Sequence, residues 1–254
     1  MSYNFDNMKL ENNTILITGG SVGIGFAFAE YFSKNNKVII CGRSISKLEA
    51  AKQKIPSLQI YQCDISKEEE CDGLFELISK EHPDVNILIN NAGIQRPINI
   101  LDKNTRKVDE VDINFKGTIY LSMLFAEFIS KKPNAAILNV SSGLAFVPSA
   151  MFPIYCATKA GIHSFTMSLR RQLKDKNVEV IEIIPPMVHD TFLKGQPIER
   201  NERSISTSEL LEEVINGLKE NKNEIAAGPA KYMMENSKKD LNSAFEQMNK
   251  NFTF

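Results

Sequence analysis

A tyrosine and a lysine stand four residues apart in the stretch YCATK, which runs from Tyr155 to Lys159. Residues at positions i and i+4 of a helix lie on the same face, so the phenol and the amine would be neighbours there. A free tyrosine has a pKa of about 10, and a nearby ammonium favours its phenolate. Ser141 and Ser142 lie fourteen and thirteen positions upstream. These residue types suit a site of proton transfer. The alternative is an ordinary half-exposed helix whose lysine reaches solvent.

A glycine-rich loop near the N-terminus could bind the phosphates of a cofactor. Gly19, Gly23 and Gly25 stand between an expected strand at 13–18 and an expected helix from residue 23. Glycines in that position permit a tight turn and let a pyrophosphate approach the free N–H groups of the helix N-terminus. The spacing is G-x-x-x-G-x-G rather than G-x-G-x-x-G. A plain glycine-rich turn is the alternative interpretation.

The same loop also spells G-x-S-x-G around Ser21, which is the nucleophile-elbow pattern of α/β-hydrolases. In hydrolases the elbow follows a central strand deep in the chain, whereas here it follows the first expected strand. The sequence has no HGGG-like segment for an oxyanion hole, and His189 would be the only well-placed base. A serine hydrolase that uses Ser21 is therefore the weaker hypothesis.

The end of the second expected strand bears on the choice of dinucleotide. Enzymes that prefer NAD usually carry an acidic residue there, which binds the ribose 2′-hydroxyl. This chain has Gly42, Arg43 and Ser44 instead. The arginine offers a permanently charged, planar fork to a 2′-phosphate, and the serine can donate another hydrogen bond. The sequence therefore favours NADP(H) over NAD(H), and a surface arginine is the alternative.

Short apolar runs alternate with amphipathic stretches along the whole chain. The expected strands are 13–18, 37–41, 57–63, 85–90, 135–142, 178–185 and 224–228. The expected helices are 23–34, 45–55, 66–82, about 104–131, 154–175, 208–221 and a tail at about 229–251. Strict alternation predicts an α/β fold of the Rossmann type: a doubly wound parallel sheet of about seven strands with helices on both faces. We expect one catalytic domain over 1–254, with a substrate lid at about 187–206.

Composition narrows the classes of function. The formal net charge is −1, from 30 basic and 31 acidic residues, so nothing indicates binding of nucleic acid. No apolar run is long enough to cross a bilayer, and the N-terminus lacks the pattern of a signal peptide. The four cysteines form no CxxC pair and, with three scattered histidines, make no metal site. We expect a cytoplasmic protein with reduced thiols and no metal.

Six motifs in order resemble the short-chain dehydrogenase/reductase family: the glycine loop, CDIS, NNAG, NFKG, NVSS and YCATK. The resemblance runs from about residue 13 to 191 and implies a catalytic tetrad of Asn114, Ser142, Tyr155 and Lys159. It implies that Tyr155 is the acid/base, that Lys159 tunes it and orients the ribose, and that Ser142 stabilises the substrate oxygen. Asn114 would anchor a water that relays protons. The residues expected to contact the cofactor are Gly19, Ser21, Gly23, Ile24, Gly25, Arg43, Ser44, Asp64, Ile65, Asn91, Ala92, Gly93, Tyr155, Lys159, Pro185 and Val188.

The resemblance implies an oxidoreductase that transfers a hydride between NADP(H) and a small-molecule carbonyl or alcohol. It also implies a homodimer or homotetramer, formed through the two long helices at about 104–131 and 154–175. The chain departs from the family at Pro185-Pro186, where Pro-Gly is usual, which leaves the register up to Thr191 open by one residue. Several stretches are similar to oxidoreductases associated with D-alanylation of teichoic acids in Gram-positive bacteria. A non-catalytic protein that senses dinucleotides on the same fold is the alternative.

Overall fold

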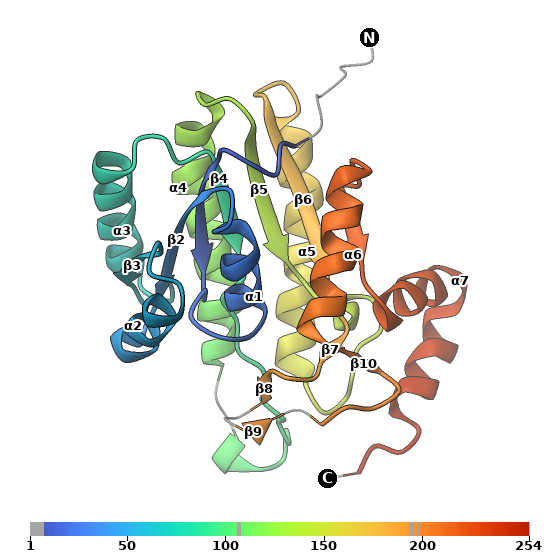
Figure 1. The fold of residues 1–254 in the computed structure, drawn as a ribbon. Coiled ribbons are helices and arrows are strands. Elements are labelled where there is room, and N and C mark those ends of the chain that lie inside the picture. The colour runs from blue at the N-terminus through green and yellow to red at the C-terminus, as the bar shows by residue number, and fades with distance from the viewer. Residues whose placement is uncertain (1–7, 106–107, 194–195, 198, 254) are drawn as a thin grey trace.

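A parallel sheet of seven strands forms the centre of the molecule in this computed structural model, which describes residues 8–105, 108–193, 196–197 and 199–253 (Figure 1). The spatial order of the strands is β11-β6-β5-β4-β1-β2-β3, and every neighbouring pair is parallel. The strands are β1 (Thr14–Thr18), β2 (Lys37–Gly42), β3 (Gln59–Gln62), β4 (Ile87–Asn90), β5 (Ala135–Val140), β6 (Val178–Ile184) and β11 (Glu224–Ala226). Apart from the edge strand β3, the strands are mostly buried, which is typical of a sheet covered on both sides.

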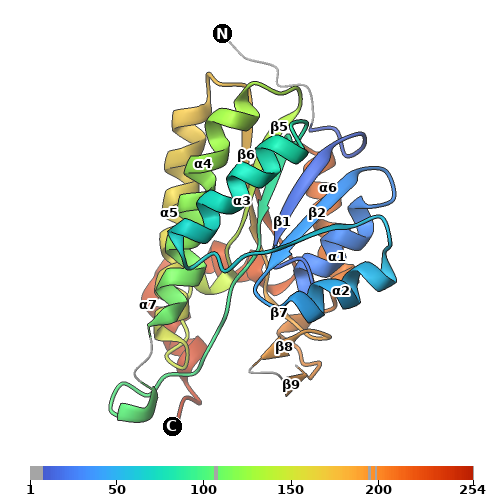
Figure 2. The same cartoon turned by 90° about the vertical axis from the view of Figure 1, so that its left-hand side faces the viewer.

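Helices cover both faces of this sheet, as Figure 2 shows edge-on. One face carries α1 (Gly23–Phe32), α2 (Ile45–Lys54) and α6 (Thr207–Lys219). The other carries α3 (Glu68–Glu81), α4 (Thr118–Ser130) and α5 (Pro153–Leu173). Successive strand residues point to opposite faces, so Ile15 and Ile17 join the core under α1, while Leu16 joins the core under α4. The predicted doubly wound fold is confirmed.

The chain reverses its direction of progress through the sheet between β1 and β4. Strands β1, β2 and β3 run outward on one side, and β4, β5, β6 and β11 run outward on the other. The crevice at the carboxyl ends of strands where such a reversal occurs is the usual ligand site of open α/β sheets. Both the glycine loop after β1 and the NNAG stretch after β4 begin at this point.

The helix expected at about 104–131 is not continuous. A 3₁₀ turn, η1 (Lys103–Thr105), comes first, and a π-helix, η2 (Val111–Gly117), leads directly into α4. Residues 106–107 lie outside the described part of the chain. A π-helical stretch inside a helix frequently marks a functional position, and this one contains Asn114.

The expected lid at 187–206 holds four short strands at the carboxyl end of the sheet (Figure 1). They are β7 (Met187–Val188), β8 (Phe192–Leu193), β9 (Gln196–Pro197) and β10 (Ser204–Ile205), with β10 paired to β7 and β9 to β8. The tail is helical as predicted, since α7 spans Pro229–Asn249 with a kink at Asp240. Within the described residues, no helix has the length and apolarity needed to span a membrane.

Candidate active site

The glycine loop is built by close packing between β1 and α1. Gly19 has a φ of +65°, a conformation that glycine adopts without strain, and its N–H donates to the carbonyl of Cys41 at 2.8 Å. A Cβ at Gly25 would lie 2.3 Å from the carbonyl oxygen of Gly19. Only a glycine at position 25 lets the first turn of α1 approach the loop this closely.

The end of β4 is tied to this loop by Asn91 and Thr18. The Asn91 side chain donates to the carbonyl of Thr18 at 3.0 Å, and the Thr18 hydroxyl accepts from the backbone N–H groups of Asn91 and Ala92 at 3.0 Å each. The structure thus brings Gly19, Asn91 and Ala92 together, as the motifs predict. Thr18 was not among the predicted residues, although its position as the last residue of β1 could have indicated it.

Arg43 and Ser44 lie where β2 ends and α2 begins. The Ser44 hydroxyl caps α2 by accepting from the N–H of Lys47 at 3.4 Å, and the Arg43 side chain is exposed. A Cβ at Gly42 would lie 3.9 Å from the hydroxyl of Ser21, so this corner faces the glycine loop. A cation at a helix N-terminus beside that loop forms a positive corner that can hold a phosphate.

Asp64 and Ile65 follow β3 at the same end of the sheet. One carboxylate oxygen of Asp64 accepts from the N–H and hydroxyl of Ser66, at 3.1 and 2.7 Å, which fixes the side chain. Ile65 is buried, and its carbonyl would lie 2.4 Å from a Cβ placed at Gly117 in η2. Ile65 therefore packs against the π-helix through its side chain and backbone.

Tyr155 and Lys159 lie on one face of α5, and the lysine is buried. The Lys159 side chain is 4% exposed, and its Nζ donates to the carbonyl of Val140 at 2.7 Å. The same Nζ lies 5.7 Å from the centroid of the Tyr155 ring. Burial lowers the pKa of Lys159 to about 8, against the opposing effect of the carboxylate of Glu182.

The phenol of Tyr155 is held in its neutral form in the protein chain alone. Burial raises the pKa of Tyr155 to about 12, and the nearby hydroxyl of Ser142 acts in the opposite direction. The sequence-based expectation was that the lysine would lower this pKa, but desolvation dominates. A neutral phenol is the form that can donate a proton.

The two serines after β5 have different partners. Ser142 caps a short 3₁₀ turn, η3 (Gly143–Ala145), by accepting from the N–H of Leu144 at 3.1 Å, and its hydroxyl lies near enough to Tyr155 to lower the pKa of the phenol. Ser141 donates instead to Glu182 at 2.5 Å. The structure therefore brings Ser142, the residue chosen from the sequence, to the tyrosine.

Asn114 joins the NNAG loop to α5. Its Oδ1 accepts from the N–H of Ile94 at 2.8 Å, and its Nδ2 donates to the Ile94 carbonyl at 2.8 Å and to the Thr158 hydroxyl at 3.3 Å. A Cβ at Gly93 would lie 3.3 Å from Oδ1 of Asn114 and 3.6 Å from Nζ of Lys159. Asn114, Gly93 and Lys159 thus share one corner of the site.

The segment after β6 lies against the same strand ends. The carbonyl of Pro185 accepts from the N–H of Gly143 at 2.9 Å, and the carbonyl of Val188 accepts from the Thr191 hydroxyl at 2.6 Å. Both Pro185 and Val188 are buried. The His189 ring is 3.1 Å from the Ser204 hydroxyl, within the paired strands of the expected lid.

The geometry does not favour the serine hydrolase hypothesis. The rings of His82, His163 and His189 are hydrogen-bonded to Tyr61, Glu182 and Ser204, respectively. None of these bonds prepares Ser21 for attack, because a nucleophilic serine needs a base within hydrogen-bonding reach.

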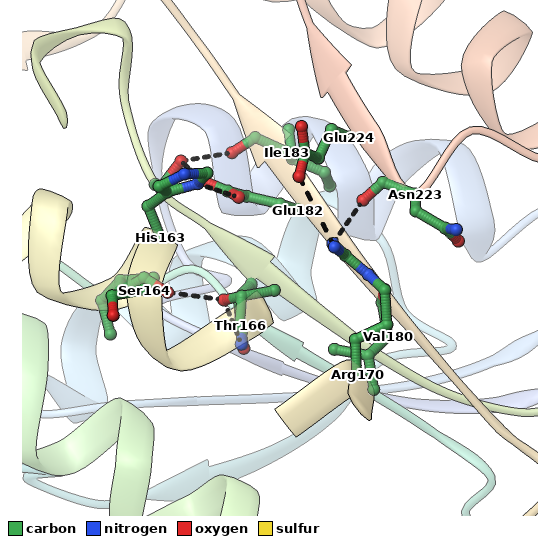
Figure 3. Close-up of polar contacts among 12 residues, drawn as sticks. His163, Ser164, Thr166, Arg170, Val180, Glu182, Ile183, Asn223 and Glu224 are labelled. Carbon is green, nitrogen blue, oxygen red and sulfur yellow. Dashed lines mark hydrogen bonds and ion pairs between the residues drawn. The ribbon is translucent and has the colours of Figure 1, made fainter. Parts of the chain in front are cut away.

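One buried polar group behind the site, Glu182, was not among the predicted residues. Glu182 in β6 accepts a hydrogen bond from Ser141, which directly follows β5. It also contacts His163 of α5 (Figure 3). The only available signal was an acidic residue inside the otherwise apolar stretch VEVIEIIP.

Comparison with known proteins identifies the class. A model of the short chain dehydrogenase family matches residues 13–202. The chain is 45% identical over 250 residues to the uncharacterized oxidoreductase DltE of Bacillus subtilis (strain 168), covering 95% of this chain and 98% of that protein. It is 29% identical over 190 residues to an uncharacterized oxidoreductase of Staphylococcus epidermidis, covering 74% of this chain and 83% of that one. The chain therefore belongs to the short-chain dehydrogenase family, and it is related to DltE-type oxidoreductases.

Solved structures share the fold at low sequence identity. A short chain dehydrogenase of Burkholderia cenocepacia, in complex with NADP, superposes with a TM-score of 0.81 at 23% identity, covering 95% of this chain and 99% of that one. A short-chain dehydrogenase of Sphingobium yanoikuyae, in complex with NADPH, gives 0.77 at 20% identity, covering 91% and 95%. A short chain dehydrogenase/reductase of Burkholderia phymatum, in complex with NAD, gives 0.78 at 17% identity, covering 96% and 98%.

Proposed function

We propose that this protein is an NADP(H)-dependent oxidoreductase that interconverts a carbonyl compound and an alcohol. The observation that carries the proposal is the meeting of Ser142, Tyr155 and Lys159 at the carboxyl end of β5, next to Gly93 of the NNAG loop. Within the same proposal, residues 1–254 form one cytoplasmic catalytic domain that acts on a small molecule.

The residues present fit a dinucleotide. Gly25 has no side chain where the first turn of α1 packs on Gly19, and Gly93 has none where it faces Nζ of Lys159. When bound, the nicotinamide ring supplies the hydride or accepts it. The protein's own residues then have to position the substrate oxygen and control its proton.

In this proposal three side chains transfer the proton and stabilise the substrate oxygen. Tyr155 donates its phenolic proton to the oxygen of the substrate during reduction, and its raised pKa keeps that proton in place beforehand. Ser142 hydrogen-bonds the same oxygen as negative charge develops there. Lys159 stabilises the phenolate that remains and would hold the ribose. The water expected at Asn114 stays a prediction.

The choice of NADP(H) rests on Arg43. The solved neighbours include complexes with NADP, NADPH and NAD, so they do not decide the question. The exposed arginine at the N-terminus of α2 supports NADP(H), because a 2′-phosphate would meet both its charge and the helix dipole there. We expect Arg43→Ala to weaken NADPH binding about tenfold or more, with little change for NADH, as measured by titration of each nucleotide. Equal losses for both would contradict the assignment.

Replacement of the tyrosine tests the reaction itself. We expect Tyr155→Phe to abolish NADPH oxidation across a panel of aldehydes and ketones while NADPH still binds. Tyr232→Phe, at an exposed position on α7, is the matched control and should keep full activity. Turnover by the Tyr155 variant would refute the proposal. A wild-type protein that binds NADPH but turns over nothing in the panel would instead favour a dinucleotide sensor.

A further inference from the structure

Glu110 is a fully buried carboxyl group that lies directly before η2. Its exposed fraction is 0%. Its Oε1 accepts from the backbone N–H of Arg96 at 3.1 Å, and its Oε2 has no hydrogen-bond partner among the described residues. A buried ionised carboxylate is costly unless it is paired and hydrogen-bonded, and a group without such partners takes up a proton instead. The surroundings of Glu110 therefore favour the uncharged acid.

The arginine that donates its N–H to Glu110 uses its side chain elsewhere. The guanidinium of Arg96 forms an ion pair with Asp109. Burial raises the pKa of Glu110, the N–H and the charge of Arg96 oppose this rise, and the charge of Asp109 adds to it. On α5, which packs against η2, the titratable groups that face Glu110 are Tyr155 and Cys156. A negative charge on Glu110 would raise the pKa of both groups, so neither stabilises its ionised form.

Residues 94–98 connect two parts of the candidate site. They begin directly after Gly93, at the corner that this glycine shares with Lys159. At their other end, the N–H of Ile98 donates to the carbonyl of Met151 at 3.0 Å, in the loop that leads into α5. Within the proposed function, we therefore expect this segment to form one wall of the space for the substrate.

Two side chains from one helical stretch hold this segment. Asn114 binds Ile94 at both backbone groups, and Glu110, four residues earlier, binds the N–H of Arg96. The contact with Arg96 explains why a polar side chain is present at position 110, because an apolar residue would remove the acceptor. The unpartnered Oε2 indicates that this polar side chain carries no charge.

We propose that Glu110 is a positioning residue that stays protonated at neutral pH and holds residues 94–96 in the site through the N–H of Arg96. The inference rests on the proposed function for its effect on turnover. The state of the carboxyl group can be measured without a substrate, so the inference and the proposed function can fail separately.

The protonation state is tested by NMR of the whole protein labelled with ¹³C at Cδ of glutamate, because the acid and the carboxylate give different chemical shifts. At neutral pH we expect a signal at the position of the acid that is absent from Glu110→Gln. Glu127→Gln is the matched control, since Glu127 is exposed on α4 and pairs with Lys131, and it should leave this signal in place. A wild-type spectrum with every signal at the carboxylate position, or an acid signal set that Glu110→Gln leaves unchanged, would overturn the proposal.

The holding role is tested by comparing Glu110→Gln with Glu110→Met. Glutamine keeps an acceptor for the N–H of Arg96, whereas methionine has a similar length but no such acceptor. We expect the KM for a carbonyl substrate to be about tenfold higher in the methionine variant than in the glutamine variant, with a much smaller difference in kcat. Equal KM values in the two variants would overturn the holding role.

Two further comparisons keep the outcome unambiguous. If Glu110→Gln does not fold, Glu110→Met assigns the NMR signal in its place, and a wild-type spectrum without an acid signal still decides against the proposal. An active Tyr155→Phe enzyme would refute the proposed function and leave the NMR result standing. An inactive Tyr155→Phe enzyme whose Glu110 is ionised would refute only the inference about Glu110.

Discussion

The folded, cofactor-free protein stabilises the ammonium form of Lys159 poorly. Its pKa in the folded chain, about 8, lies below the ordinary lysine value of 10.5. The ammonium is therefore destabilised by folding, and the cost is fully present below pH 8 and disappears above pH 10.5, where both states are neutral. Since one pKa unit corresponds to about 1.4 kcal/mol, lowering the pKa from 10.5 to about 8 costs on the order of 3 to 4 kcal/mol at neutral pH.

Replacing Lys159 should increase the stability of the folded protein, and the proposed function predicts that it lowers activity. We expect Lys159→Met to raise the free energy of unfolding of the cofactor-free protein at pH 7 by roughly 2 kcal/mol, because the buried charge is gone and one hydrogen bond to Val140 is lost. Urea unfolding at pH 7 and at pH 10.5 measures this, and the gain should shrink at the higher pH. Lys131→Met, at an exposed position, should show no such gain. A variant less stable than wild type at pH 7 would contradict the argument.

Spacing along the chain predicts some contacts of the site and not others. Tyr155 and Lys159 meet because they are one helical turn apart, and Ser142 rather than Ser141 meets the tyrosine, as the motif spacing indicates. The contact between Glu182 and His163 joins a strand to a helix. Because no fixed spacing along the chain relates such positions, a local sequence pattern could not predict this contact. The raised pKa of Tyr155 escaped prediction for a related reason: burial depends on every element around the ring.

The elements around the site are less regular than their sequences suggest. The apolar periodicity of residues 109–130 predicts a helix, but it does not distinguish bonds between residues four apart from bonds between residues five apart, so the π-helix at Val111–Gly117 could not be predicted. The wider turn accompanies the inward placement of the fully buried Asn114, whose side chain holds Ile94 at both backbone groups. The short paired strands of the expected lid were likewise not visible in its polar composition.

Helix α7 is hydrogen-bonded to the loop that precedes Tyr155. After the kink at Asp240 its last turn brings Asn249 to that loop, where its Oδ1 accepts from the N–H of Ala150 at 2.6 Å and its Nδ2 donates to the carbonyl of Pro148 at 3.1 Å. The loop runs straight into α5, which begins at Pro153. We therefore expect the end of α7 to shape the entrance for the substrate.

Loss of the hydrogen bonds from Asn249 should weaken the use of substrate and leave cofactor binding unchanged. We expect Asn249→Ala to raise the KM for a carbonyl substrate about three- to tenfold, which is the effect of losing one or two hydrogen bonds, while the Kd for NADPH is unchanged. Steady-state kinetics and nucleotide titration measure the two quantities. Asn242→Ala, at an exposed position of the same helix, serves as control. An unchanged KM, or an equal loss for NADPH, would show that α7 does not shape the substrate site.

At the scale of the whole molecule, the order of the strands in the sheet could have been predicted from the sequence. Alternating strands and helices allow few arrangements once crossovers are right-handed and connections are short, and the glycine loop after the first strand indicates where the order reverses. A contact surface between two copies of the chain cannot be predicted in this way. Its residues resemble ordinary surface residues in the sequence until the positions of the helices are known. Helices α4 and α5 lie side by side on one face of the molecule (Figure 2).

That pair of helices carries apolar side chains toward solvent. Met123 on α4 is 67% exposed and Met167 on α5 is 52% exposed. Because exposed apolar surface is a common mark of protein interfaces, we expect the protein to be a homo-oligomer of two-fold symmetry that buries both residues. The double variant Met123→Lys, Met167→Lys should then dissociate to monomers in sedimentation velocity, since each interface would bury four unpaired ammonium groups. Met187→Lys, which also changes an exposed methionine but lies in the expected lid, should leave the oligomer intact. A wild-type protein that sediments as a monomer would contradict the expected oligomer. A double variant that still assembles would show that the interface does not lie at Met123 and Met167.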